Sequence, residues 1–461
     1  MKLPIPDGFL IGTSSSAWQV EGVSGKSPEQ KSWAELFYET DPGRWHDGIG
    51  PQKASDFYHR YSEDIEKIAS AGLNAFRITI QWARFMKDAL TGEVDPEAAA
   101  YYHSVIDTIK KKGMKPVVSL EHWDIPAVLF ETGDGWASRQ TVELYADYVE
   151  KVLAEFHDDV DLWFAFTEPN IPIDNGYLKK LWYPFRHDPR AAYQAHFHKI
   201  LATAKAVEIS RKYPNVQMGA MIHLTPVYPA SDDQADLTAA YYADLFEVRL
   251  YLDAYVKGEI PADVFTELAK HDCSIDVREE DLEQIRNHPV DILGIDYYFP
   301  IRVKARTEPY TGPFSPHYYY EDYVWPQREF NADRGWEIYP QAIYDTAIRL
   351  RDDYGNPSWI VTENGIGIEN EGRWRNDQGQ IEDDYRIDFI RRHLFQTLKA
   401  REEGCDVGGY FIWSFIDNVS ALNAFKNRYG LLELDLDTYE RKPKKSLDWL
   451  KKVLSQKEIE D

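Results

Sequence analysis

The chain has 461 residues and a formal net charge of -25, from 77 acidic against 52 basic residues. That balance argues against nucleic acid or an anionic membrane surface as partners, because both attract basic proteins. Hydrophobic residues make up 43% of the chain and aromatic residues 14%, so it can bury a large core. It shows neither a signal-peptide pattern nor a membrane-length apolar run, and Cys273 and Cys405 cannot form a disulfide framework, so we expect a cytoplasmic protein.

Strand-like and helical runs alternate along the whole chain. Continuous apolar runs predict buried strands at 9–13, 75–80, 116–120, 162–167, 216–223, 290–296, 359–362 and 407–413. Amphipathic spacing predicts helices at 54–71, 96–112, 138–156, 191–213, 238–257, 340–354, 384–403 and 444–454.

Eight such strand-and-helix units predict an α/β fold of the (β/α)8 TIM-barrel type, as a single domain over residues 1–461. A barrel of this kind needs roughly 250 residues. The surplus lies in long loops at 14–53, 169–190 and 297–336, which all follow strands and would build a deep pocket at the carboxyl ends of the strands. The alternative is an open doubly wound sheet for a nucleotide, but the stretch 12–16 lacks the glycine-rich first turn that such a sheet uses.

Two of the predicted strands end in Thr-Glu followed by a breaker. Glu168 precedes Pro169, and Glu363 precedes Asn364-Gly365. Two carboxylates that face each other across a pocket can supply the proton donor and the nucleophile or base for cleaving a glycosidic bond. Either glutamate alone could be a solvated loop residue, but the pair with its aromatic surroundings favours catalysis.

The other predicted strand ends carry polar and aromatic side chains that suit a ligand with many hydroxyl groups. They are Gln19, Arg77, His122, Asp296, Tyr298 and Trp413. No histidine pair has metal-ligand spacing, since His196 and His198 lie two apart on a predicted helix and we expect them on the solvated surface. No metal or cofactor is therefore implied.

Several motifs in the correct order resemble glycoside hydrolase family 1, the retaining β-glucosidase-like barrels, from Gly8 to Trp449. They lie at 9–13, 18–22, 77–84, 122–126, 335–340, 362–365 and 410–418. The resemblance implies Glu363 as nucleophile and Glu168 as general acid/base, with Arg77 and Asp296 supporting the nucleophile. Tyr298 would sit beside Glu363 and help to keep it ionised. The substrate-binding residues would include Gln19, His122, Thr167, Tyr298, Trp336 and Trp413.

Three departures from the family pattern bear on specificity. Thr167 and Asp296 each stand where the family usually has Asn, which puts recognition of the sugar 2-hydroxyl in question. Ser420-Ala421 replaces a Glu-Trp pair that holds the sugar 4- and 6-hydroxyls in plain β-glucosidases. Ser420 and Tyr429 are similar to the 6-phospho-β-glycosidase branch, whose usual lysine position is Asn427 here, with Lys426 one place earlier. The resemblance implies Ser420, Lys426 and Tyr429 as further substrate-binding residues, at the phosphate.

We therefore expect an enzyme that acts on a small-molecule carbohydrate, as a 6-phospho-β-glucosidase. A plain β-glucosidase with broad β-glucoside and β-galactoside activity is the alternative, and the displaced lysine favours it. A catalytically silent sugar-binding protein is a third reading, suggested by Thr167 and Asp296. The sequence leaves a homo-oligomer open.

Overall fold

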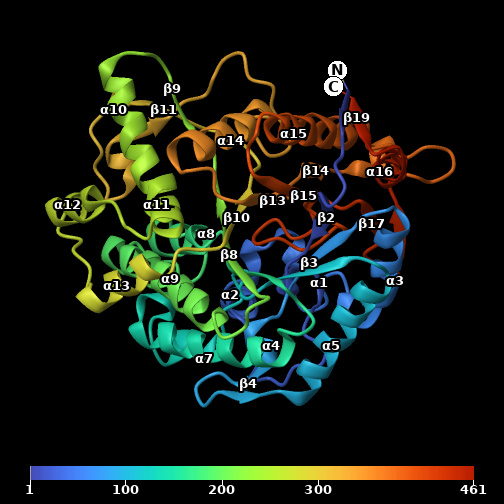
Figure 1. Ribbon diagram of the computed structural model, residues 1–461. Helices are drawn as coiled ribbons and strands as arrows, with labels where there is room; N and C mark the ends of the chain where they lie inside the picture. The colour runs from blue at the N-terminus through green and yellow to red at the C-terminus, as the bar shows by residue number, and fades with distance from the viewer. Residues whose placement is uncertain (1, 461) are drawn as a thin grey trace.

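The computed structural model describes residues 2–460, and within them eight parallel strands close into a barrel (Figure 1). The strands in chain order are β2 (Leu10–Ser14), β3 (Ala75–Thr79), β6 (Lys115–Ser119), β7 (Leu162–Thr167), β8 (Gln217–His223), β10 (Ile292–Asp296), β13 (Trp359–Asn364) and β15 (Val407–Ile412). Each strand pairs with the next, and β15 closes the ring by pairing with β2. The expected (β/α)8 barrel is confirmed, with strand ends shifted by only one or two residues.

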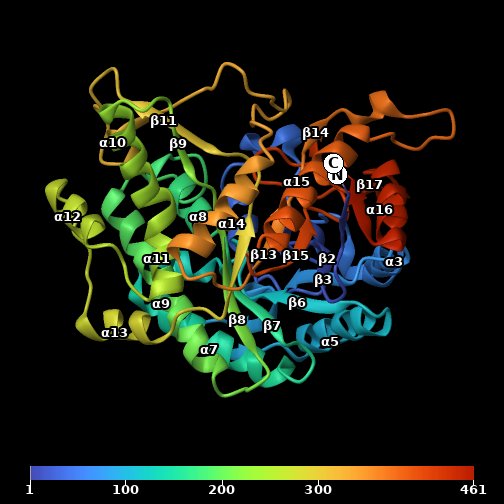
Figure 2. The same ribbon diagram turned by 45° about the horizontal axis from the view of Figure 1, so that its top comes forward.

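Helices surround the barrel, as the two views show (Figure 2). The principal ones are α3 (Phe57–Ser70), α5 (Pro96–Lys111), α7 (Arg139–Phe156), α9 (Pro189–Ser210), α10 (Gln234–Ala243), α11 (Leu250–Lys257), α14 (Gln341–Asp353), α15 (Asp384–Glu402) and α16 (Lys445–Gln456). Helix α5 illustrates how the sequence sets the first residue of a helix. The Asp95 carboxylate accepts hydrogen bonds from the first-turn amides of Glu97 and Ala98, and Pro96 occupies the position that needs no amide partner.

The region after β8 is more elaborate than expected. The expected helix at 238–257 begins earlier, at Gln234, and is interrupted by a π-helical turn at Asp244–Arg249. Two short helices follow, α12 (Ala262–Lys270) and α13 (Glu279–Asn287). Strands β9 (Val227–Pro229), β11 (Ile301–Ala305) and β12 (Tyr320–Asp322) form a small separate sheet, which packs beside α10 (Figure 2).

The expectation of surface histidines on α9 is wrong. His196 and His198 are both buried. His196 hydrogen-bonds to the Tyr251 hydroxyl at 2.7 Å and to Asp174 at 3.1 Å, while His198 hydrogen-bonds to the Trp136 carbonyl at 2.9 Å. The helix is covered on both flanks, by α7 and by the segments around Asp174 and Tyr251, so residues two apart can both be enclosed.

Short strand pairs tie the loops and termini together. They are β1 (Lys2–Pro4) with β19 (Glu458–Glu460), β4 (Met86–Asp88) with β5 (Glu93–Val94), β14 (Ile368–Glu369) with β16 (Asn427–Arg428), and β17 (Leu432–Leu434) with β18 (Arg441–Pro443). The first pair brings the two ends of the chain side by side (Figure 1). Across residues 2–460 no helix combines the length and apolarity needed to cross a membrane.

Candidate active site

A cavity of about 310 Å³ lies at the carboxyl ends of the barrel strands. The long loops after β2, β7 and β10 contribute to it, as the sequence predicted. Most of the expected site residues line this cavity, namely Gln19, His122, Glu168, Tyr298, Trp336, Glu363, Trp413, Ser420 and Tyr429. The fold thus brings both candidate catalytic glutamates to one pocket, although they come from β7 and β13.

Glu363 lies near the end of β13 and is 2% exposed. Its carboxylate accepts a hydrogen bond from the Tyr298 hydroxyl at 2.6 Å and a charged hydrogen bond from the Arg77 guanidinium. Burial raises the pKa of Glu363, while the charge of Arg77 and the hydrogen bonds of both partners act to lower it. Arg77 and Tyr298 therefore act in the expected direction and also fix the carboxylate in one orientation.

Glu168 follows the last residue of β7 with a backbone φ of +42°, in the left-handed region that side chains with a Cβ rarely adopt. Its amide is held by the Met221 carbonyl at 3.1 Å, so the turn is fixed despite its strain. Burial raises the pKa of Glu168 well above its ordinary value, and the nearby charges of Asp296 and Glu363 raise it further. At Glu168 only the charge of Arg77 opposes the effect of burial on the pKa, whereas at Glu363 the charge of Arg77 and two hydrogen bonds oppose it. This difference favours Glu168 as the glutamate that carries the proton.

The two residues that replace the family's Asn do not line the cavity. Thr167 is fully buried, and its hydroxyl hydrogen-bonds to Ser119 at 2.9 Å inside the barrel. The short Thr167 side chain is thus engaged away from the pocket, and its role in binding substrate stays a prediction. Asp296 is also fully buried and accepts a hydrogen bond from Thr362 at 2.6 Å.

Asp296 lies in a cluster of charges beneath the pocket. One of its oxygens is 4.0 Å from Arg77, and the other is buried without a hydrogen-bond partner in residues 2–460. Burial and the charge of Glu363 raise the pKa of Asp296 well above its ordinary value. Arg77 is thus shared between two carboxyl groups, which limits how far it can lower the pKa of either one.

Two uncharged polar side chains present hydrogen-bonding atoms to the pocket. Gln19 donates to the Val419 carbonyl at 2.8 Å, which leaves its buried side-chain oxygen without a partner among the described residues. His122 has an unpartnered Nδ1, and burial together with the charges of Arg77 and Lys199 holds its pKa well below the usual range. A neutral imidazole and an amide oxygen suit sugar hydroxyl groups.

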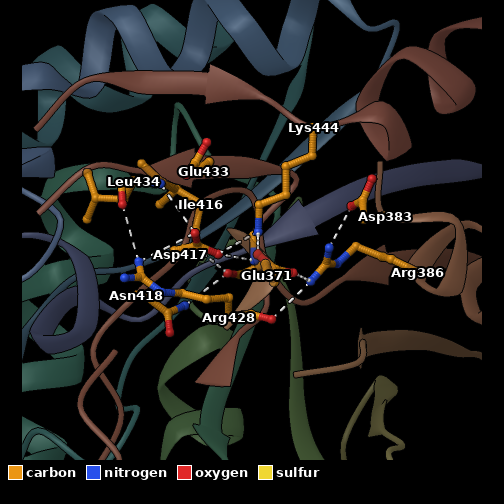
Figure 3. Close-up of polar contacts among 12 residues, drawn as sticks. Glu371, Asp383, Arg386, Ile416, Asp417, Asn418, Arg428, Glu433, Leu434 and Lys444 are labelled. Atoms are coloured by element: carbon orange, nitrogen blue, oxygen red, sulfur yellow. Dashed lines mark hydrogen bonds and ion pairs between the residues drawn. The ribbon is translucent and has the colours of Figure 1, made fainter. Parts of the chain in front are cut away.

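The loop that carries Ser420 and Tyr429 rests on a buried ionic network (Figure 3). Lys444 pairs with Glu371 and, at 2.9 Å, with Asp417. Arg386 pairs with Glu371 at 2.7 Å and donates to the Arg428 carbonyl at 2.9 Å. The network therefore anchors both ends of the segment 417–428, which carries Ser420 and leads directly into Tyr429.

The structure places the loop cation expected at the phosphate, Lys426, outside the sugar pocket. Lys426 does not line the sugar pocket, because it pairs with Glu369 at 2.9 Å and lines a separate cavity. Arg334 lines the pocket instead, from the loop after β10. The only sequence signal for it was its position directly before the motif at 335–340. The same cavity is lined by Asn175, Trp182 and His223, which the sequence did not indicate, and by Trp123, Asn418 and Asn423, which lie in stretches that it did.

Comparison with known proteins identifies the family. The model for glycosyl hydrolase family 1 matches residues 1–459. The chain belongs to glycosyl hydrolase family 1. It is 40% identical over 453 residues to a 6-phospho-beta-glucosidase, GmuD of Bacillus subtilis, with 97% of each chain covered. It is 30% identical to Beta-glucosidase A of Acetivibrio thermocellus, with 98% of each covered.

The fold of this glycoside hydrolase agrees with a solved structure of the same family. The family 1 β-glucosidase from Thermotoga maritima superposes with a TM-score of 0.90 at 29% identity, with 99% of each chain covered. Together these similarities confirm that the chain is a glycoside hydrolase with a (β/α)8 barrel.

Proposed function

We propose that the enzyme hydrolyses terminal β-glycosidic bonds of 6-phospho-β-glucosides with retention of anomeric configuration. The observation that carries this proposal is the convergence of Glu168 and Glu363 on one cavity, with Arg77 and Tyr298 bound to Glu363. The similarity to GmuD and the replacement of an acidic residue by Ser420 support the phosphorylated sugar. A carboxylate at that position would repel a phosphate group.

In the proposed mechanism each glutamate acts twice. Glu363 attacks the anomeric carbon while Glu168 gives its proton to the departing glycosidic oxygen, so that a glycosyl ester forms as the carbon–oxygen bond breaks. Glu168, now ionised, takes a proton from water, which attacks the anomeric carbon and releases Glu363. Residues Gln19, His122 and Trp413 would bind the sugar ring, as the family resemblance implies, and Asp296 would act through Arg77 and Glu363.

The plain β-glucosidase remains the second candidate, because Lys426 lies outside the pocket and Beta-glucosidase A is also a relative. Rates on 4-nitrophenyl β-glucoside and on its 6-phosphate decide between the two. We expect a higher kcat/KM for the phosphate, and a higher value for the unphosphorylated glucoside would refute the phospho-sugar proposal. A phosphorylated substrate, formed inside the cell, would also fit the cytoplasmic location that we propose.

Two variants test the catalytic roles. Glu363→Gln should abolish turnover of both substrates, whereas Glu93→Gln, at an exposed glutamate outside the pocket, should behave as the wild type. The first product released by the wild type should be the β-anomer, as detected by proton NMR. Release of the α-anomer, or full activity in Glu363→Gln, would refute the double-displacement mechanism.

A further inference from the structure

The sugar pocket has a distinctive charge distribution. Its wall carries the carboxylates Glu168 and Glu363 together with the guanidinium of Arg334, and no lysine or second arginine lines it within the described part of the chain. In residues 2–460 Arg334 also has no carboxylate within ion-pairing distance. Arg334 is half-buried, and an anionic ligand in the pocket would meet a guanidinium that no carboxylate already neutralises.

We infer that Arg334 is the residue that binds the substrate 6-phosphate, in place of a lysine on the loop after β15. This inference rests on the proposed phospho-glucosidase function and identifies the residue that confers it. A guanidinium can donate two parallel hydrogen bonds to phosphate oxygens, which gives both affinity and orientation.

The backbone holds Arg334 in place before any substrate binds. Gly335 adopts a φ of +72°, and its amide donates to the Asn331 carbonyl at 2.7 Å, which closes a tight turn around Arg334. Asn331 is buried, and its side-chain amide donates to the Gly367 carbonyl at 2.8 Å. The turn is thus fastened to the segment after β13, which limits the entropy lost when a ligand binds.

The guanidinium keeps donors free for a ligand. It lies over the Trp336 ring, 4.1 Å from the centroid, and its Nη1 donates to the Asn427 side-chain oxygen at 3.3 Å. Its Nε is buried without a partner in residues 2–460. An unsatisfied buried donor of this kind is unfavourable in the unliganded pocket, and a hydrogen bond to a phosphate oxygen would satisfy it.

Two hydroxyl groups complete the anion site. Ser420 and Tyr429 line the same pocket as Arg334, and the charge and hydrogen bonding of Arg334 act to lower the pKa of Tyr429, although burial raises it overall. Tyr429 packs so closely on Gly367 that a Cβ there would lie 2.3 Å from its ring. A guanidinium, a phenol and a serine hydroxyl are all donors to phosphate oxygens.

The same geometry explains why a lysine is not needed at 427. Asn427 is 2% exposed and accepts a hydrogen bond from Arg334, so a lysine there would place an ammonium group against the guanidinium. Lys426, by contrast, is exposed and already paired with Glu369. The cation of the proposed phosphate site therefore lies on the loop after β10 and not on the loop after β15.

The test compares the selectivity ratio, kcat/KM for 4-nitrophenyl β-glucoside 6-phosphate divided by that for the unphosphorylated glucoside. We expect Arg334→Gln to lower this ratio by about 10- to 100-fold, as for loss of hydrogen bonds to a charged group. Lys426→Gln is the matched control and should keep the wild-type ratio. Arg334→Gln with Asn427→Lys should recover part of the ratio, since it restores one cation on the other loop.

The outcomes separate the two proposals. A wild type that prefers the phosphorylated substrate, with the ratio unchanged in Arg334→Gln, overturns the inference and leaves the proposed function standing. A ratio that falls in Lys426→Gln but not in Arg334→Gln likewise overturns the inference and leaves the proposed function standing. A wild type that prefers the unphosphorylated glucoside overturns both. Recovery in the double variant shows that a poor ratio in Arg334→Gln does not arise from misfolding.

Discussion

Replacing Lys444 should lower the folding stability of this enzyme in a pH-dependent way. It is fully buried and contacts two buried carboxylates, Glu371 and Asp417 (Figure 3). Burial acts to raise the pKa of Glu371, but the charges of Lys444 and Arg386 outweigh it and hold this pKa at about 2, against an ordinary value of 4.5. A difference of about 2.5 units corresponds to about 3 kcal/mol of folding free energy.

The sign of this contribution fixes its pH range. Because the pKa of Glu371 is lower in the folded state, the stabilisation is fully present above pH 4.5 and is lost as the pH falls toward 2. Lys444→Met keeps the length and apolar stem but leaves two buried carboxylates short of a cation. We expect a loss of about 3–5 kcal/mol at pH 7, the usual result of removing one partner from a buried pair.

Reversible urea unfolding followed by tryptophan fluorescence measures this loss. The difference in unfolding free energy between wild type and Lys444→Met should shrink at pH 3, where Glu371 is largely protonated in the unfolded state. Lys442→Met, at a half-exposed lysine paired with Glu440, is the matched control and should change stability by less than about 1 kcal/mol. A loss below 1 kcal/mol in Lys444→Met, or a difference from wild type that does not vary with pH, would refute this role of Lys444.

Three further predictions concern the pocket. Asp296→Asn removes a charge that raises the pKa of Glu168, so the alkaline limb of the kcat/KM profile should move to lower pH, and an unmoved limb would contradict that coupling. Gly367→Ala should push the Tyr429 ring aside and raise KM for the phosphorylated substrate several-fold, with little effect on kcat, in steady-state assays. Tyr298→Phe removes the 2.6 Å hydrogen bond to Glu363 and should lower kcat about 10-fold or more, and a wild-type kcat would show that this bond does not support the nucleophile.

Hydrophobic periodicity predicted the barrel because its strands are covered on both faces. A run such as 162–167 must be apolar throughout when one side meets the barrel interior and the other meets helices. The end of such a strand also had to lie at the pocket, which placed Glu168 and Glu363 there from the sequence alone. Helices such as α5 and α7 followed from a different periodicity, since each packs one apolar stripe against the barrel.

The separate small sheet and the buried histidines of α9 could not be predicted, because each depends on contacts between distant segments. Strand β11 is paired with β9, more than 70 positions earlier in the chain, and His196 is enclosed by Tyr251. Such non-local contacts leave no periodic pattern in either partner.

Local patterns in the chain were enough to predict the barrel and the pair of carboxylates, because apolar strands and the residues at their ends can be read without knowing long-range contacts. The cation that lines the pocket could not be read in this way. In the sequence Lys426 and Arg334 are both loop cations, and nothing local distinguishes them. In the structure Lys426 pairs with Glu369, whereas the turn at Asn331 and the ring of Trp336 hold Arg334 at the cavity. The direction of a loop side chain depends on what packs beneath it, and here those supports come from other loops of the barrel.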